Sequence, residues 1–179
     1  MGITWIDPFE TDLTRRATEL VRVKFEDKRY GDQEYLYHLF AVLQLVIPRT
    51  PHQDDEIRAA AILHDIIEDT DVTREDLERD FGPRVARIVW GVTDGEGKTR
   101  RERHQAVYQK LQADDDALLV KLCDRYANVS HCWKTQSPLL FMYHREYPEF
   151  RKELRKADPL PMHRHLWDGL DKLMGWRDR

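Results

Sequence analysis

The sequence lacks the features that would cross-link the chain, anchor it in a membrane or attract it to nucleic acid. Two cysteines, Cys123 and Cys132, are too few for a disulfide framework and indicate a reducing compartment, so we expect a cytoplasmic protein. No apolar run approaches the roughly 20 residues that span a membrane. A net charge of −4 gives no overall basic field, so nucleic acid is not an expected partner.

The chain also lacks convincing strand patterns, internal repeats and low-complexity linkers, whereas apolar residues at helical spacing occur along its whole length. We therefore expect a single all-α domain over residues 1–179, a helical bundle of about eight to ten helices. The expected helices are 9–27, 34–47, 53–69, 73–82, 83–90, 99–112, 114–133, 137–156 and 162–175.

The most informative segment joins an apolar run to four side chains that bind metals or protons. His64, Asp65, Glu68 and Asp69 fall within roughly 140° of arc on a continuous helix, with apolar residues on the opposite side. Carboxylates close to a core are costly unless they are paired or bind a cation. The segment therefore predicts a metal-centred reaction site.

Two further positions fit the same site. His38 lies in an almost wholly apolar helix, where a lone histidine is more often a satisfied core residue than a ligand. Asp124 shares a helix face with Lys121, Asn128 and His131, and by itself it is better explained by a surface ion pair with Arg125 or Lys121. By helical phase, Cys123 faces the core and is not a ligand.

Together, these positions resemble the HD-domain metal-dependent phosphohydrolases. The resemblance implies that one divalent ion is held by His38, His64, Asp65 and Asp124. Mixed imidazole and carboxylate ligands suit Mn²⁺, Fe²⁺ or Co²⁺ better than a structural zinc site.

Longer motifs narrow the resemblance to the RelA/SpoT-type alarmone hydrolases. It rests on AAILHDIIEDT at 60–70, TREDLERDFGPRVARIVWGVTD at 73–94, KLCDRYAN at 121–128 and YLYH at 35–38, and it covers about residues 15–155. Residues 159–179 would be a C-terminal helical extension. The chain departs from the family pattern at Leu39, where a proline is usual, and at Tyr126-Ala127.

The family resemblance implies hydrolysis of the 3′-diphosphate of (p)ppGpp, with ppApp left open, to give GDP or GTP and pyrophosphate. It implies Mn²⁺ as the ion and Glu68 and Asp69 as the catalytic pair. The chain is similar to the standalone small alarmone hydrolases, some of which neutralise alarmone-synthetase toxins, so pairing with such a toxin is a further expectation.

An anionic nucleotide would need basic and aromatic contacts, and we expect these from residues near the motifs. The candidates are Lys28, Arg29, Lys98, Arg100, Arg101, Lys121, Asn128 and Tyr147. For most of the basic residues a solvated surface charge is an equally good interpretation, and Tyr147 also fits a half-buried aromatic. His131 is a weaker candidate for a supporting role.

Two alternatives keep the same fold. One is an HD-type nucleotide or NADPH phosphatase, and the other is a noncatalytic antitoxin or regulatory module. In the C-terminal extension, Leu166 and Leu170 begin an apolar stripe that either packs on the core or lets the chain form a homo-oligomer. His163 and His165 there are better explained by a solvated helix start than by metal binding.

Overall fold

The fold is described from a computed structural model, which covers residues 11–51, 54–95 and 97–177. The described residues form ten α-helices, a 3₁₀ turn and a two-stranded hairpin. They are α1 (Asp12–Lys24), β1 (Arg29–Tyr30), β2 (Gln33–Glu34), α2 (Leu36–Val46), η1 (Ile47–Arg49), α3 (Asp55–Leu63), α4 (Ile66–Asp69), α5 (Arg74–Phe81), α6 (Pro83–Val92), α7 (Arg100–Ala113), α8 (Asp115–Thr135), α9 (Leu139–Leu154) and α10 (Pro161–Leu173). The predicted all-α class and the number of helices are confirmed.

Local sequence explains most helix boundaries. Thr11, Thr73 and Thr99 each form a capping box that opens α1, α5 and α7, respectively. Gly82 has a φ of 90°, which separates α5 from α6, and Pro83 then occupies the first turn of α6. Residues 9 and 10, at the start of the first predicted helix, lie outside the described residues.

The prediction of one continuous helix over 53–69 is wrong at its centre. α3 ends at Leu63, His64 is its C-cap, and Asp65 adopts φ −99° and ψ 0° before α4 begins. The carbonyl of Ala61, which a continuous helix would pair with the backbone N–H of Asp65, instead lies 2.8 Å from Nδ1 of His64. The imidazole thereby competes with the backbone hydrogen bonds of the helix at the start of the His64-Asp65 motif.

The hairpin is a second difference, because no strand was expected. Arg29 pairs with Glu34 and Tyr30 with Gln33 in antiparallel register, and Gly31 occupies the turn with a φ of 63°. Two residues per strand are too few for an alternating pattern, so no periodicity indicated these strands.

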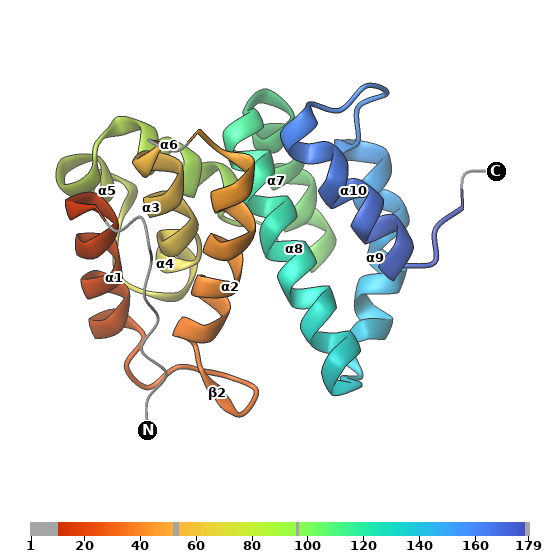
Figure 1. Cartoon of the computed structure of the whole chain (residues 1–179), viewed down its shortest axis with the longest axis horizontal. Coiled ribbons are helices and arrows are strands. Elements are labelled where there is room, and N and C mark those ends of the chain that lie inside the picture. Colours follow the sequence, from red (N-terminus) through yellow and green to blue (C-terminus); the bar gives the residue numbers. More distant parts are fainter. Residues whose placement is uncertain (1–10, 52–53, 96, 178–179) are drawn as a thin grey trace.

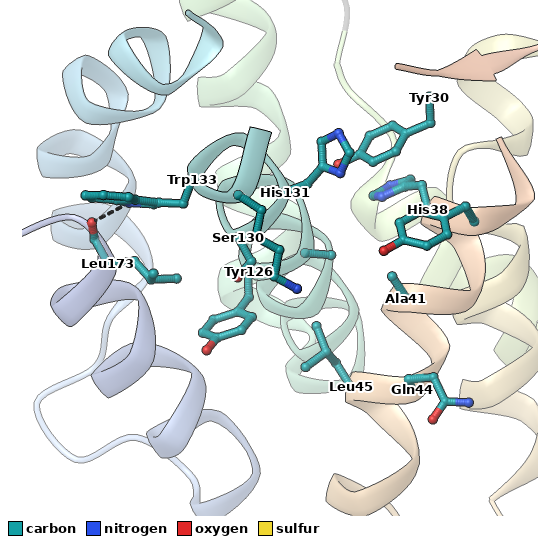
Figure 2. A pocket seen from close by; sticks show the side chains of 13 residues that line it. Tyr30, His38, Ala41, Gln44, Leu45, Tyr126, Ser130, His131, Trp133 and Leu173 are labelled. Carbon is teal, nitrogen blue, oxygen red and sulfur yellow. Dashed lines mark hydrogen bonds between the residues drawn. The ribbon is translucent and has the colours of Figure 1, made fainter. Parts of the chain in front are cut away.

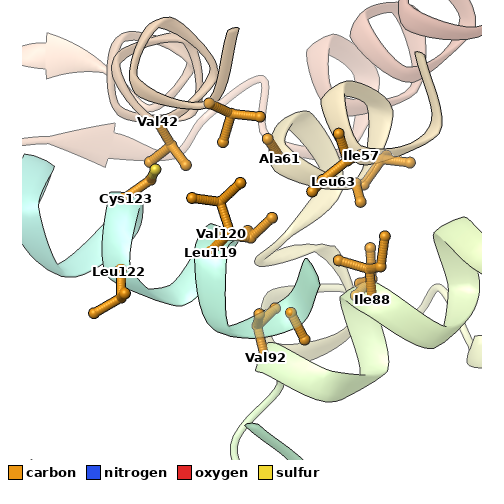
Figure 3. Packing of buried hydrophobic residues seen from close by; sticks show 14 of the residues in the cluster. Val42, Ile57, Ala61, Leu63, Ile88, Val92, Leu119, Val120, Leu122 and Cys123 are labelled. Carbon is orange, nitrogen blue, oxygen red and sulfur yellow. The ribbon is translucent and has the colours of Figure 1, made fainter. Parts of the chain in front are cut away.

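Helices α2 and α8 pack against each other at the middle of the molecule and bring distant parts of the sequence together. Figure 1 shows α1 and α3–α6 on one side of this pair and α7, α9 and α10 on the other. The core between them is apolar, and Val42, Leu63, Ile88 and Val120 are fully buried within it (Figure 3). Cys123 is also fully buried there, as its helical phase predicted.

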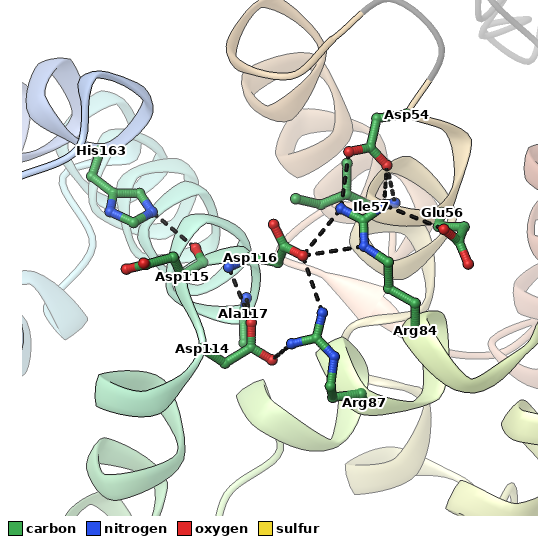
Figure 4. Close-up of polar contacts among 10 residues, drawn as sticks. All are labelled: Asp54, Glu56, Ile57, Arg84, Arg87, Asp114, Asp115, Asp116, Ala117 and His163. Atoms are coloured by element: carbon green, nitrogen blue, oxygen red, sulfur yellow. Dashed lines mark hydrogen bonds and ion pairs between the residues drawn. The ribbon is translucent and has the colours of Figure 1, made fainter.

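The C-terminal helix α10 packs along α8. Leu166, Trp167 and Leu170 are buried, so the apolar stripe contributes to the core. His163 is 1% exposed, and its Nε2 lies 2.9 Å from the carbonyl of Asp115, so the prediction of a solvated histidine is wrong there (Figure 4). No helix among the described residues is both long and apolar enough to cross a membrane.

Candidate metal centre

Four predicted ligands come together from three places in the chain. His38 lies on α2, His64 and Asp65 form the junction between α3 and α4, and Asp124 lies on α8. Nε2 of His38 is 3.3 Å from Nε2 of His64, 3.7 Å from Oδ2 of Asp65 and 3.3 Å from Oδ1 of Asp124. Nε2 of His64 is 3.0 Å from Oδ2 of Asp65 and 3.8 Å from Oδ1 of Asp124.

The donor set fits a divalent transition-metal ion. Both histidine side chains are 2% exposed, and those of Asp65 and Asp124 are 15% and 13% exposed. Nδ1 of His64 lies 2.8 Å from the carbonyl of Ala61, which places a proton on Nδ1, so in the neutral imidazole the Nε2 lone pair faces the cluster. Two imidazole nitrogens and two carboxylate oxygens that converge in a shielded site are ligands suited to such an ion.

The charges of the cluster depend on one another. Burial alone would lower the pKa of His64, but the facing carboxylates of Asp65 and Asp124 raise it to about 9. Burial would raise the pKa of Asp124, but hydrogen bonding to His38 and the charge of Lys121 lower it to about 2. At neutral pH the imidazole of His64 therefore carries a proton beside these carboxylates, and a metal ion that bound there would displace it.

A cleft of about 320 Å³ opens beside the cluster. Its walls carry five carboxylates, Asp65, Glu68, Asp69, Asp94 and Asp124, and four basic side chains, Lys28, Arg100, Lys121 and Arg125. The acidic groups outnumber the basic ones, so binding of an anion there requires further positive charge. A divalent ion at the ligand cluster would supply it.

The predicted catalytic pair lies on α4, at the edge of this cleft. Glu68 accepts a hydrogen bond from the backbone N–H of Asp94, and displacement of water by the surrounding protein raises the pKa of its carboxyl group. Asp69 forms an ion pair with Lys28, which also lies 3.9 Å from the ring centroid of Tyr35.

The predicted substrate contacts divide into two groups. Lys28, Arg100, Lys121 and Asn128 line the cleft. Arg29, Lys98 and Tyr147 are not among the described residues that line it. The guanidinium of Arg29 donates to the carbonyl of Asp32, and Lys98 is exposed in the loop before α7.

Tyr147 was predicted to contact the nucleotide, but the structure places it away from the cleft. It is 2% exposed, and its hydroxyl donates to Oδ1 of Asp171 on α10 at 2.5 Å. Its helical phase points it toward the C-terminal helix, which the family motifs do not cover. We therefore correct its assignment to a structural contact.

Several cleft residues did not emerge as sequence candidates. Tyr35, His104 and Tyr143 line the cleft, and Arg125 joins Arg100 in ion pairs to Glu146 at 3.2 and 2.6 Å. Arg125 directly follows the predicted ligand Asp124, and this adjacency could have indicated that Arg125 lies near the site. His104 and Tyr143 come from α7 and α9, where only the tertiary fold reveals their proximity. The side chain of Arg101 lies outside the described residues.

A second, more apolar pocket of about 570 Å³ adjoins the metal cluster, and His38 lines both hollows. It lies between α2 and α8 and reaches α10 at Leu173. Figure 2 shows Tyr30, His131 and His38 grouped at one end of this pocket, with Tyr126 and Leu45 farther along. His131, a weaker candidate for the site, thus lies beside the cluster and not within it.

The chain matches the HD domain family model over residues 15–138. A relative from Danio rerio, guanosine-3′,5′-bis(diphosphate) 3′-pyrophosphohydrolase MESH1, is 41% identical over 111 residues, or 59% of this chain and 61% of the relative. The human protein of the same name is 33% identical over 117 residues, or 63% of this chain and 65% of the relative. The match thus spans less than two thirds of these relatives' own length.

A solved structure agrees with the fold. It belongs to a metazoan orthologue of SpoT that hydrolyses ppGpp, and it superposes with a TM-score of 0.76 at 23% identity over 93% of this chain and 96% of the other. At that identity the likeness concerns the fold alone. The family match over most of the chain, together with the cluster of His38, His64, Asp65 and Asp124, shows that this chain belongs to the HD domain family.

Proposed function

We propose that this chain is a Mn²⁺-dependent 3′-pyrophosphohydrolase that converts (p)ppGpp to GDP or GTP and pyrophosphate. The proposal is carried by one observation: a single cleft borders the ligand cluster and is also lined by the acidic pair Glu68 and Asp69 and by basic side chains. Relatives named for this activity share 33–41% identity over the matched segment, which supports the same substrate class.

The ion would be held by His38, His64, Asp65 and Asp124. When bound, a divalent ion supplies Lewis acidity, which polarises the diphosphate and lowers the pKa of the attacking water. Mn²⁺ suits these nitrogen and oxygen ligands, and Fe²⁺ or Co²⁺ would fit the same set.

The phosphates would be held by the basic side chains of the cleft. Burial would lower the pKa of Lys121, but Asp124 and Glu68 raise it above its ordinary value, so Lys121 remains charged. Arg125 and Arg100 both form ion pairs with Glu146, which orients their remaining N–H groups. The single carboxylate balances only one of the two positive charges. Lys28 would lie on the opposite side, beside Asp69.

Proton transfer would fall to Glu68 and Asp69 jointly. The water oxygen forms a bond to the phosphorus next to the sugar, and the bond from that phosphorus to the 3′-oxygen breaks. The water gives up a proton to a carboxylate, and the leaving 3′-oxygen takes one. A carboxyl group with a raised pKa, such as Glu68, is suited to carry a proton between the two.

The nucleoside end would extend toward the adjoining apolar pocket. Tyr30, Tyr37 and His131 offer aromatic faces there, and the pocket meets the cluster at His38. Aromatic faces stack on any base, so this arrangement favours a nucleotide and leaves the choice of base open.

The test is release of pyrophosphate from ppGpp with Mn²⁺ by the wild type, Asp65→Ala and Glu68→Ala. Metal-dependent turnover should be present in the wild type and lost in both variants. Asp116→Asn, on the same helix as Asp124 but far along it, is the matched control and should retain turnover. Absence of turnover in the wild type would contradict the proposal and favour a noncatalytic module. Turnover unchanged by both substitutions would show that Asp65 and Glu68 do not carry the reaction, and it would also contradict the proposal.

The same assay with ppApp and NADPH separates the remaining substrates. The expected order is ppGpp first, with ppApp accepted to a lesser extent. Release of inorganic phosphate from NADPH, without pyrophosphate from ppGpp, would instead identify an NADPH phosphatase.

The compartment and partners follow as part of the proposal. Cys123 and Cys132 are both free and buried, which is compatible with a reducing cytoplasm. Functional pairing with an alarmone-synthetase toxin would be tested by co-expression, in which the wild type should relieve growth arrest and Asp65→Ala should not.

A further inference from the structure

The β1–β2 hairpin brings two tyrosine hydroxyls to the ligand cluster. Tyr35, directly after β2, donates to Oδ2 of Asp65 at 2.5 Å. Tyr30, in β1, donates to Oδ1 of Asn128 at 2.9 Å. Neither hydroxyl belongs to the four ligands, so both contacts support the cluster from outside.

The Tyr30 contact reaches a ligand through one intermediate. Nδ2 of Asn128 donates to Oδ1 of Asp124 at 2.5 Å, and the same oxygen lies 3.3 Å from Nε2 of His38. The Tyr30 hydroxyl donates its proton and therefore needs the amide oxygen of Asn128 as acceptor. With the oxygen on that side, the amide NH₂ faces the carboxylate of Asp124. If the Asn128 amide were rotated by half a turn, its oxygen would face the carboxylate oxygen of Asp124 and repel it. The Tyr30 hydroxyl therefore helps to fix the orientation of Asp124.

The Tyr30 ring touches a second ligand. It stacks on His38 with a centroid separation of 4.8 Å and an interplanar angle of 24°, and the ring of His131 lies 4.4 Å from it (Figure 2). The left-handed conformation of Gly31 closes the hairpin so that Tyr30 can reach this position. A single side chain thus contacts His38 with its ring and controls Asp124 with its hydroxyl.

We propose that Tyr30 is a positioning residue of the metal centre, acting on Asp124 through Asn128 and on His38 through ring packing. The inference rests on the proposed function only in that a divalent ion binds the cluster. Partners that orient metal ligands typically contribute 10–100-fold to metal affinity or activity.

The decisive measurement is Mn²⁺ affinity, obtained by calorimetry or by the electron paramagnetic resonance signal of free Mn²⁺. Tyr30→Phe keeps the ring and removes the hydroxyl, and it should weaken Mn²⁺ binding by about tenfold. Tyr30→Leu also removes the stacking surface and should weaken binding further. Restored affinity on return from Leu to Phe would measure the contribution of the ring alone.

A double-mutant cycle tests the route through Asn128. Asn128→Ala removes the intermediate, so adding Tyr30→Phe to it should cause little further loss of Mn²⁺ affinity. Additive losses would mean that Tyr30 and Asn128 act separately and would overturn the proposed route.

Tyr147→Phe is the matched control because it removes another partly shielded tyrosine hydroxyl with a carboxylate partner, Asp171. It should lower the thermal midpoint and leave Mn²⁺ affinity unchanged. An unchanged Mn²⁺ affinity in Tyr30→Phe, or an equal loss in Tyr147→Phe, would overturn the proposal.

The two proposals fail in different ways. If Mn²⁺ binding weakens in Tyr30→Phe while the wild type releases no pyrophosphate from ppGpp, the inference stands and the proposed substrate is wrong. If the wild type hydrolyses ppGpp but Tyr30→Phe binds Mn²⁺ normally, the inference is wrong and the function stands. No saturable Mn²⁺ binding by the wild type would overturn both.

Discussion

Helix α8 and its N-cap contribute carboxylates to two charged clusters, and the groups that face these carboxylates differ. At its start, Asp114 and Asp116 meet Arg87 and Arg84, and Arg84 also binds Asp54 through both oxygens at 2.7 and 2.9 Å (Figure 4). In its middle, Asp124 meets His38 and His64. The first group will be called the arginine cluster and the second the metal cluster.

The two clusters differ in whether the cationic group that faces the carboxylates can give up its charge to a metal ion. A guanidinium stays charged at any ordinary pH and pairs with carboxylates in a fixed geometry, so the arginine cluster is complete without a ligand. An imidazole releases its proton and then offers a lone pair, so the metal cluster can exchange a proton for a metal ion. Carboxylates therefore stabilise the fold in the arginine cluster, whereas in the metal cluster they form a site that a metal ion could enter.

The largest effect should come from removing a metal ligand. Asp65→Ala should abolish saturable Mn²⁺ binding and metal-dependent turnover, because two imidazoles and one carboxylate no longer neutralise the ion. The measurements are calorimetric titration and pyrophosphate release, with Asp116→Asn as the control. Retained Mn²⁺ binding in Asp65→Ala would show that the ion binds elsewhere.

The pH dependence should distinguish the two clusters next. Although burial would lower it, the pKa of His64 is raised to about 9 by Asp65 and Asp124, so metal binding displaces a proton below that pH. Apparent Mn²⁺ affinity should fall about tenfold for each pH unit below 9. Titrations from about pH 9 to about pH 7 would measure this slope, and a flat profile would contradict the assignment.

The contribution of the arginine cluster to stability should change with pH only in acid. Burial alone would raise the pKa of Asp54, but hydrogen bonds from Arg84 and the backbone N–H of Ile57 lower it below its ordinary 3.8. A lowered folded-state pKa contributes stability that is present above 3.8 and is lost as the pH falls through the folded value.

Arg84→Ala should therefore lower the free energy of unfolding by about 1–3 kcal/mol near neutral pH, because Asp54 and Asp116 lose their partner. Urea unfolding measures the loss, which should shrink in acid as those carboxylates become protonated. Turnover should remain at the wild-type level. A loss of turnover without a loss of stability would show that the two clusters are coupled.

The smallest effect should come from Arg87→Ala. Its side chain is 46% exposed, so water and salt screen its pairs with Asp114 and Asp116. We expect a loss of about 0.5–1 kcal/mol in the free energy of unfolding. Urea unfolding of Arg87→Ala beside Arg84→Ala checks the order, and an equal loss in both would mean that burial does not separate the two arginines.

Much of the metal cluster could be predicted because its parts are local motifs. His64-Asp65 and the apolar helix around His38 are legible as spacing and composition, and the phase of α8 correctly placed Lys121, Asp124 and Asn128 on one face. The break between α3 and α4 was missed because it depends on one hydrogen bond, from the imidazole of His64 to the carbonyl of Ala61. No periodicity records a contact of that kind.

The contacts around the cluster were less predictable because they join distant segments. Tyr147 was assigned to nucleotide binding, but its helix turns it toward Asp171, 24 residues away along the chain. Tyr30 reaches Asn128 across 98 residues from a hairpin with too few residues to leave a strand pattern. The arginine cluster likewise joins three helices whose surface charges carry no pairing information in sequence.

The sequence by itself determined the helical class, the helix caps, the identities of the four candidate ligands and the neighbouring acidic pair. Short-range rules govern these features, because apolar periodicity, capping and i to i+4 spacing act within a few residues. Only the tertiary structure decided which carboxylates meet arginine and which meet histidine. That choice follows from the packing of α2, α3 and α6 against α8, which sets the partner of each charge across the core.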